Sequence, residues 1–148
     1  MEYVQTARHA DCFLCEDVTT DDLTGNYILV RSDLCLVVMN RFPYNTGHLL
    51  ISPLRLVGSL EELTDGERAE VMELTVKAIG ALRQAMDPEG FNLGANLGAA
   101  AGAGVPGHLH IHLVPRWAGD TNFMPVTAGS KVLPETIDQT YARLQPLF

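Results

Sequence analysis

The sequence predicts an α+β fold: a five-stranded, mostly antiparallel sheet with one long helix and a short C-terminal helix. Five segments have the apolar runs or the two-residue alternation of strands, whereas only one long segment keeps helical spacing. The predicted order is three strands, the long helix and two further strands. Because one long helix provides only one long crossover, most neighbouring strands should run antiparallel.

The first three strands are expected after a polar, irregular segment. Runs rich in Val, Ile and Leu, separated by turn residues such as the Ser32-Asp33 pair, are typical of neighbouring strands. In the third strand His48, Leu50 and Ser52 would share one face, because side chains alternate across a strand. The irregular segment is predicted over residues 1–25, and the strands over 26–31, 34–40 and 48–52.

The long helix is predicted over residues 64–86. Thr64 and Glu67 have the T-x-x-E spacing of a capping box. Apolar residues then recur on one helical face until Pro88 and Gly90 end the pattern. These apolar residues are Val71, Leu74, Ala78, Leu82 and Ala85. A shorter helix is predicted from about Pro134 to Leu144.

The last two strands flank a loop of small residues. The segment 91–97 is the fourth strand, weakened by Gly94, and 98–107 is the loop. The fifth strand, HLHIHLV over 108–114, would place its three histidines on one face and its apolar residues in the core. Pro115 lacks an N–H for the ladder and is expected to end this strand. The three histidines are His108, His110 and His112.

Three histidines on one face have three interpretations. A packing role alone is disfavoured, because a core rarely takes three titratable rings. A metal site is the second, although the Cα atoms of His108 and His112 would lie about 13 Å apart at a rise of ~3.3 Å per residue, too far for one ion. One histidine could instead join Cys12 and Cys15, whose C-x-x-C spacing is that of a zinc half-site. Two unbound thiols are the alternative.

Nucleophilic catalysis is the third interpretation. A neutral imidazole nitrogen attacks phosphorus or carbonyl carbon when an acceptor holds its other nitrogen as N–H. In the preceding loop Gly102, Gly104 and Gly107 have G-x-G-x-x-G spacing, but a strand follows them, which argues against a dinucleotide-binding motif. A Gly-rich turn can still present backbone N–H groups to phosphate oxygens. A flexible connection is the alternative for this loop.

Length and charge narrow the class of protein. The 148 residues fit one domain that spans residues 1–148. The net charge of -8 argues against nucleic-acid partners, but not against a small anionic ligand. Neither a run of about 18 apolar residues nor a signal peptide is apparent, so we expect a cytoplasmic protein without a membrane partner. The three cysteines, an odd number, argue against a disulfide framework.

The segment HLHIHLV resembles the signature of the histidine triad (HIT) family, in which histidines alternate with apolar residues. VVMNRFPYNTGHLLISPLR, residues 37–55, is similar to the family's strand–turn–strand segment, and FNLGANLG also fits. The tail VPRWAGDTNFMPV with KVLPE is closest to the bacterial branch of diadenosine tetraphosphate phosphorylases and related hydrolases. The resemblance covers roughly residues 10–125 and implies a HIT-like fold whose sheet extends across a homodimer.

The resemblance also implies roles for four histidines in nucleotidyl transfer on a small nucleotide substrate. His110 matches the nucleophile that carries the nucleotidyl group as a phosphoramidate. His112 matches the residue that contacts phosphate and the leaving oxygen. His108 and His48 match residues that order the site.

Four further residues are implied to bind substrate. Asn40 and Asn96 match residues that contact ribose or phosphate, and Gly104 and Val105 belong to the glycine loop beside the phosphate. Many relatives have Ser or Thr at the place of Val105, where the hydroxyl donates to phosphate. In this chain that donor is therefore either missing or supplied by backbone N–H groups.

The cysteine pair departs from the pattern of zinc-binding relatives. Those relatives combine C-x-x-C and the first histidine of the triad with a histidine in P-x-x-H after the third strand. Leu56 takes that place here, so the ligand set lacks its usual fourth member. The set is Cys12, Cys15 and His108, and the histidines that could replace the missing ligand are His9 and His48. The resemblance implies no required cofactor and allows one structural zinc.

The sequence therefore predicts an enzyme that cleaves a phosphoanhydride of dinucleoside polyphosphates through a covalent nucleotidyl-His110. The sequence does not decide whether water or inorganic phosphate accepts the nucleotidyl group. An adenosine phosphoramidase, which cleaves P–N bonds, is one alternative. A nucleotide-binding regulatory module without turnover is the other, and the complete set of three histidines favours catalysis over it.

Overall fold

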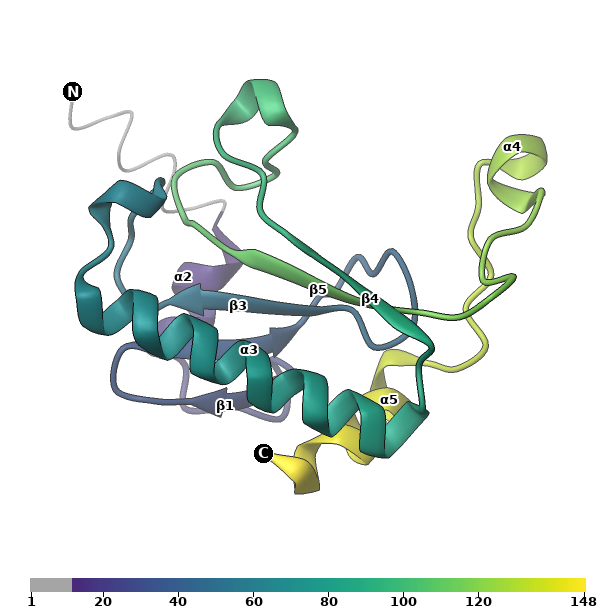
Figure 1. Ribbon diagram of the computed structural model, residues 1–148, viewed down its shortest axis with the longest axis horizontal. Coiled ribbons are helices and arrows are strands. Elements are labelled where there is room, and N and C mark those ends of the chain that lie inside the picture. Colours follow the sequence, from purple (N-terminus) through teal and green to yellow (C-terminus); the bar gives the residue numbers. More distant parts are fainter. Residues whose placement is uncertain (1–11) are drawn as a thin grey trace.

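A computed structural model describes residues 12–148, apart from the side chains of Met124 and Pro125. The candidate ligand His9 lies outside the described residues. The predicted α+β class is confirmed, because a five-stranded antiparallel sheet packs against helices (Figure 1). The strands are β1 (Ile28–Arg31), β2 (Cys35–Met39), β3 (Leu49–Pro53), β4 (Gly90–Gly94) and β5 (Ile111–Arg116), and the α-helices are α2 (Phe13–Thr19), α3 (Asp65–Met86), α4 (Met124–Ala128) and α5 (Ile137–Leu144).

The strand order in the sheet is β1-β2-β3-β5-β4. The first three strands form a meander, and α3 carries the chain from β3 across to the edge strand β4 (Figure 1). The chain then returns as β5 between β3 and β4. In this register Leu50 of β3 and Gly94 of β4 both pair with His112, so the histidine segment lies inside the sheet.

Helix α3 covers one face of the sheet and confirms the predicted capping box. The Thr64 side chain accepts a hydrogen bond from the Glu67 N–H, and the Glu67 carboxylate accepts one from the Thr64 N–H. The apolar residues predicted on one face of this helix pack against β2, β3 and β5, together with Tyr141 and Leu144 of α5. Helix α5 begins later than predicted because Thr136 caps it.

Helix α2 covers the opposite face, and the prediction of an irregular N-terminal segment was wrong over its seven residues. The Cys12 thiol caps its first turn by accepting from the Cys15 N–H at 3.4 Å. Arg31 caps the C-terminal end of α2, because its Nη1 donates to the carbonyls of Asp17, Val18 and Thr20. Seven residues are too few to show helical periodicity in a sequence. No helix among the described residues is both long and apolar enough to cross a membrane.

Strand β5 begins at Ile111, three residues later than predicted, and extends further than predicted, through Pro115 to Arg116. The prediction that three histidines share one face of this strand was wrong for His108, which precedes the strand and whose ring faces Cys12 and Cys15. The partner strand β3 pairs with β5 only as far as Leu113, so at Pro115 the strand has β4 as its one neighbour in the sheet. A proline is tolerated at such an edge-like position, because its missing N–H interrupts no ladder on that side. The alternating face of β5 therefore continues from His112 through Val114 to Arg116.

Candidate active site

Three of the predicted histidines meet where β3 and β5 run side by side. His48 immediately precedes β3, His110 precedes β5 and His112 lies in it. Asn40, just after β2, reaches His48, with its Nδ2 3.3 Å from the His48 Nδ1. The first histidine of the segment, His108, turns its ring away from this group toward Cys12 and Cys15.

The backbone fixes the tautomer of His110. Its Nδ1 lies 2.8 Å from the carbonyl oxygen of His108, and a carbonyl only accepts hydrogen bonds. The hydrogen of the neutral ring is therefore on Nδ1, and the lone pair is on Nε2. Nε2 makes no hydrogen bond with the described residues, so it is available as a nucleophile.

A chain of hydrogen bonds fixes the tautomers of the other two rings. The backbone N–H of Tyr44 donates to the His48 Nδ1 at 3.0 Å, so the hydrogen of His48 is on Nε2. The His48 Nε2 in turn donates to the His112 Nδ1 at 3.0 Å. His112 therefore carries its own hydrogen on Nε2.

The Nε2–H of His112 is a buried donor without a hydrogen-bond partner among the described residues. A buried polar group left unpaired costs about 1–3 kcal/mol, so such donors usually serve a ligand. The ring centroids of His110 and His112 are 5.0 Å apart, at an interplanar angle of 66°. A lone pair and an N–H donor thus stand side by side.

Electrostatics keeps the donor pair neutral. Burial, with smaller contributions from the neighbouring His112 and His110 rings, lowers the pKa of His48 to about 3. Burial, with His110 as a smaller cause, also lowers the pKa of His112 below its ordinary value. Both rings are therefore uncharged at neutral pH, and the assigned tautomers persist. The lone pair of His110 can attack phosphorus or carbonyl carbon, and the neutral N–H of His112 can donate a hydrogen bond to a leaving oxygen.

Of the other predicted substrate-binding residues, Asn96 lines the same cavity as His112. The Asn96 Nδ2 donates to the carbonyl of Gly102 at 3.4 Å, which joins the end of β4 to the glycine loop. Gly104 stands in open space, where an added Cβ would meet nothing within 4 Å. Val105 packs against the apolar cluster that contains Cys12, so its side chain belongs to the core.

Sequence reasoning missed two contributors to the site. Tyr44 was part of a predicted turn, yet its backbone orients His48 and its ring stacks on His112 at a centroid distance of 5.6 Å and an angle of 15°. Arg116 continues the histidine face beyond Pro115. Extending the two-residue alternation past the proline would have found Arg116, whereas a backbone N–H has no counterpart in a sequence motif.

The structure brings together the three predicted metal ligands. The sulfur atoms of Cys12 and Cys15 each lie 3.4 Å from the His108 Nδ1. The His108 Nε2 donates to the Pro53 carbonyl at 2.8 Å, which leaves the Nδ1 lone pair directed at the two thiols. Zn–S and Zn–N bond lengths at tetrahedral angles place such atoms about 3.5 Å apart, so the set fits zinc.

The fourth position of this set is not filled by His48, which was wrong as a candidate. Both of its ring nitrogens are engaged, one by the Tyr44 N–H and the other by His112. Leu56 lines a cavity of about 390 Å³ that Cys15 also lines, so the leucine side chain occupies the expected neighbourhood of the ligand. Burial and the adjacent Cys12 thiol raise the pKa of Cys15 to about 12, so its thiolate needs a cation beside it.

Comparisons with known proteins find relatives in sequence and in fold. The AP-4-A phosphorylase of Mycobacterium tuberculosis is 48% identical over 113 residues, which are 76% of this chain and 58% of that protein. The bis(5'-nucleosyl)-tetraphosphatase [asymmetrical] of Schizosaccharomyces pombe is 30% identical over 96 residues, which are 65% of this chain and 52% of that protein. The chain thus spans little more than half the length of these relatives.

A solved structure shares the fold. The Zn-bound histidine triad family protein from Mycobacterium smegmatis superposes with a TM-score of 0.73 at 21% identity, and the match covers 93% of both chains. The HIT domain family itself matches residues 25–119, which include His48, Asn96 and all three histidines of the strand segment. The chain therefore belongs to the HIT domain family.

Proposed function

We propose that this protein cleaves a phosphoanhydride bond of dinucleoside polyphosphates, such as diadenosine tetraphosphate, by nucleotidyl transfer through His110. The observation that carries the proposal is the pairing of a fixed lone pair on the His110 Nε2 with a fixed, unpartnered donor on the His112 Nε2. The names of the two relatives, a phosphorylase and a tetraphosphatase of such compounds, support this substrate class.

The reaction has two steps. In the first, the His110 Nε2 forms a bond to the phosphorus of a nucleoside monophosphate unit while the bridging P–O bond breaks, and the leaving oxygen departs as a phosphate anion that accepts a hydrogen bond from the His112 Nε2–H. In the second, the oxygen of water or inorganic phosphate bonds to phosphorus and releases any proton it carries to solvent, while the P–N bond breaks and returns the lone pair to the His110 Nε2. Asn40, Asn96 and the backbone at Gly104 and Val105 hold the transferred nucleotide.

Product analysis tests this function. Diadenosine tetraphosphate is incubated with the protein, with and without inorganic phosphate, and the nucleotides are separated. ATP with ADP shows transfer to phosphate, whereas ATP with AMP shows transfer to water, and both patterns support the proposal. Two ADP molecules formed without phosphate, or no product in either incubation, would overturn it.

We propose in addition that Cys12, Cys15 and His108 hold a structural zinc. The three donor atoms lie within 4.8 Å of one another, and His108 is oriented by Pro53 as ligands usually are by a second hydrogen bond. The ion would tie α2 to the segment before β5. Because the His108 carbonyl also holds His110, this tie steadies the nucleophile.

A homodimer is the assembly that we propose. Among the described strands, β4 pairs only with β5, so one edge of β4 is open to a partner. Beside this edge the apolar side chains of Leu93, Met72 and Val76 are 50%, 53% and 60% exposed. Helical spacing places Met72, Val76 and Arg83 on one side of α3. Arg83 packs on Phe91 of β4, so this side of α3 lies next to the open edge of β4. The exposed apolar side chains and the open edge therefore form one surface.

A further inference from the structure

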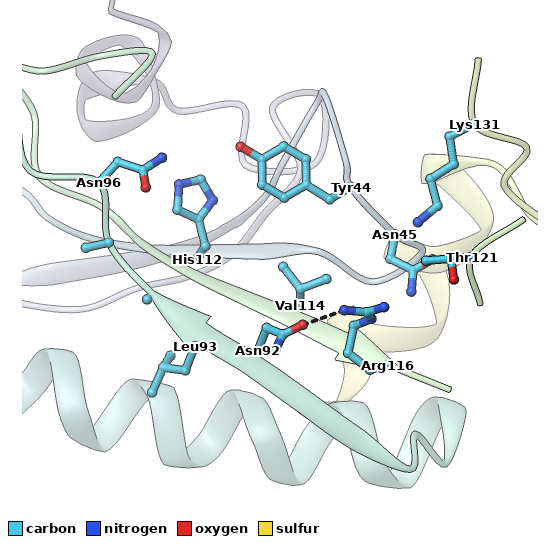
Figure 2. Close-up of a pocket in the computed structure, with 12 residues that line it drawn as sticks. Tyr44, Asn45, Asn92, Leu93, Asn96, His112, Val114, Arg116, Thr121 and Lys131 are labelled. Atoms are coloured by element: carbon cyan, nitrogen blue, oxygen red, sulfur yellow. Dashed lines mark hydrogen bonds between the residues drawn. The ribbon is translucent and has the colours of Figure 1, made fainter. Parts of the chain in front are cut away.

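A cavity of about 420 Å³ begins at His112 and runs along the outer half of β4 and β5 (Figure 2). Its floor is the continuation of the histidine face, with Val114 and Arg116 from β5 and Asn92 from β4. Lys131, from the segment between α4 and α5, lines it from the opposite side. The roles described above use only the His112 and Asn96 ends of this cavity.

Hydrogen bonds leave this cavity with one free positive charge. Arg116 is neutralised, because its Nε and Nη2 lie 2.6 and 2.7 Å from the two carboxylate oxygens of Asp120. Those oxygens also accept from the Trp117 N–H and the Asn45 amide. Lys131 makes no hydrogen bond or ion pair with the described residues, although its charge helps to lower the pKa of Asp120. Because Asp120 balances only one of the two cations, Arg116 and Lys131, the cavity keeps one net positive charge, on Lys131.

Amide donors accompany this charge. The Arg116 Nη1 donates to the Asn92 Oδ1 at 2.6 Å, so the Nδ2 of Asn92 is the end of the amide left to donate elsewhere. Thr121 adds a hydroxyl group to the lining. A lysine with amide and hydroxyl donors, but no free carboxylate, suits an anion with several oxygen atoms.

The position of the cavity fits one part of the substrate. His112 donates a hydrogen bond to the leaving oxygen, so the group bonded to that oxygen has to lie next to His112. In a dinucleoside polyphosphate this group is the remaining phosphate chain. At a rise of ~3.3 Å per residue, His112 and Arg116 are about 13 Å apart along β5, which gives room for several phosphates.

We propose that the cavity between His112 and Lys131 is the subsite for the phosphate chain of the leaving nucleotide, with Lys131 as its cation. The assignment rests on the proposed function for its place in the reaction, but the cavity's affinity for phosphate chains is measurable without turnover. After the leaving nucleotide departs, the same subsite is open to inorganic phosphate as acceptor.

Binding of inorganic tripolyphosphate, measured by titration calorimetry, tests the subsite directly. We expect the native protein to bind this probe and Lys131→Ala to bind it roughly 10-fold more weakly or worse, as for a charge-assisted hydrogen bond. Lys77→Ala is the matched control, because Lys77 is the only other lysine and contacts the C-terminal Phe148 carbonyl. No binding by the native protein, or equal binding by Lys131→Ala, would overturn the subsite.

Turnover of two substrates then distinguishes a loss at the subsite from a general disturbance of the histidines. We expect Lys131→Ala to lower kcat/KM for diadenosine tetraphosphate roughly 10-fold. The p-nitrophenyl ester of AMP has no phosphate in its leaving group, and its kcat/KM should stay within about twofold. Equal losses on both substrates would contradict the assignment. A protein that binds tripolyphosphate through Lys131 but cleaves neither substrate would refute the proposed function and leave the subsite standing.

Discussion

The Nε2 of His48 lies 3.0 Å from the Nδ1 of His112 and donates its hydrogen there. This direction is set by the backbone N–H of Tyr44, which donates to the other nitrogen of His48. As a result, a residue 64 positions away in sequence decides which nitrogen of His112 faces the substrate. The donor in the active centre is thus specified by the turn before β3 and not by the histidine segment alone.

Replacing the nucleophile should separate binding from chemistry. His110→Asn removes the attacking nitrogen but keeps a polar side chain of similar size, so we expect the fold and nucleotide binding to persist. Turnover should fall by several orders of magnitude, because no covalent intermediate forms. His112→Asn should slow the reaction less, since it removes a hydrogen-bond donor. Near-normal turnover of His110→Asn beside an inactive His112→Asn would show that the nucleophile is assigned to the wrong ring.

The lowered pKa of His48 predicts how stability depends on pH. In the unfolded chain His48 binds a proton near its ordinary pKa of 6.5, whereas in the folded chain it does so only near 3. Between these values the unfolded state holds more protons, so the free energy of unfolding falls by about 1.4 kcal/mol per pH unit as the pH drops below 6.5. Above pH 6.5 this contribution does not change.

Denaturant titrations of the native protein and His48→Gln, at pH values from 4 to 7, measure this effect. Asp17 acts in the opposite direction, because burial raises its pKa to about 6, so only the difference between the two proteins isolates His48. The advantage of the native protein at pH 7 should shrink as the pH falls. A difference that stays constant with pH would mean that His48 titrates normally in the folded state.

The proposed dimer predicts a charge-sensitive surface on α3. Val76→Glu places a charge in the apolar surface beside the open edge of β4, so we expect a monomer in sedimentation experiments at micromolar concentration. Val126→Glu is the control, because Val126 is 89% exposed on α4, away from this surface. A native protein that is already monomeric, or a Val76→Glu dimer as stable as the native one, would contradict the proposed interface.

The zinc content of the protein should depend on Cys12, Cys15 and His108. Elemental analysis is expected to find about one zinc per chain in the native protein and little in Cys12→Ser, which loses one of the three ligands. Leu56→His should hold zinc more tightly in a chelator competition, because it offers an imidazole beside Cys15. Native protein purified in the presence of zinc yet free of the metal would remove zinc from the site.

Much of the fold could be predicted because its elements carry local patterns. The capping box and apolar spacing marked α3 nearly to its last residue, and alternation marked the strands. Two elements did not follow local rules. Helix α2 is held by a thiol cap and by Arg31 from β1, contacts that only the folded chain contains. Strand β5 continues through Pro115 because β3, whose first residue Leu49 pairs with Leu113, does not extend as far as the proline.

The candidate site likewise has parts that the sequence could predict and parts that it could not. The histidine spacing pointed to His110 and His112, whose ring centroids lie 5.0 Å apart, but it did not predict that His108 turns toward Cys12 and Cys15. Their tautomers depend on two backbone groups, the Tyr44 N–H and the His108 carbonyl, and backbone groups leave no trace in residue identity. Lys131 begins the KVLPE segment, whose resemblance indicates no role for the lysine, and only the tertiary structure places it opposite Arg116.

The strand order also bears on how the chain folds. The meander β1-β2-β3 needs only contacts between segments close in sequence, which form early. Strand β5 has to dock between β3 and β4 after a connection that contains α3, and closing so long a loop is entropically costly. The hydrogen bond between His48 and His112 spans that same junction. A chain in which β5 has not docked beside β3 therefore lacks the hydrogen bond that orients the His112 donor.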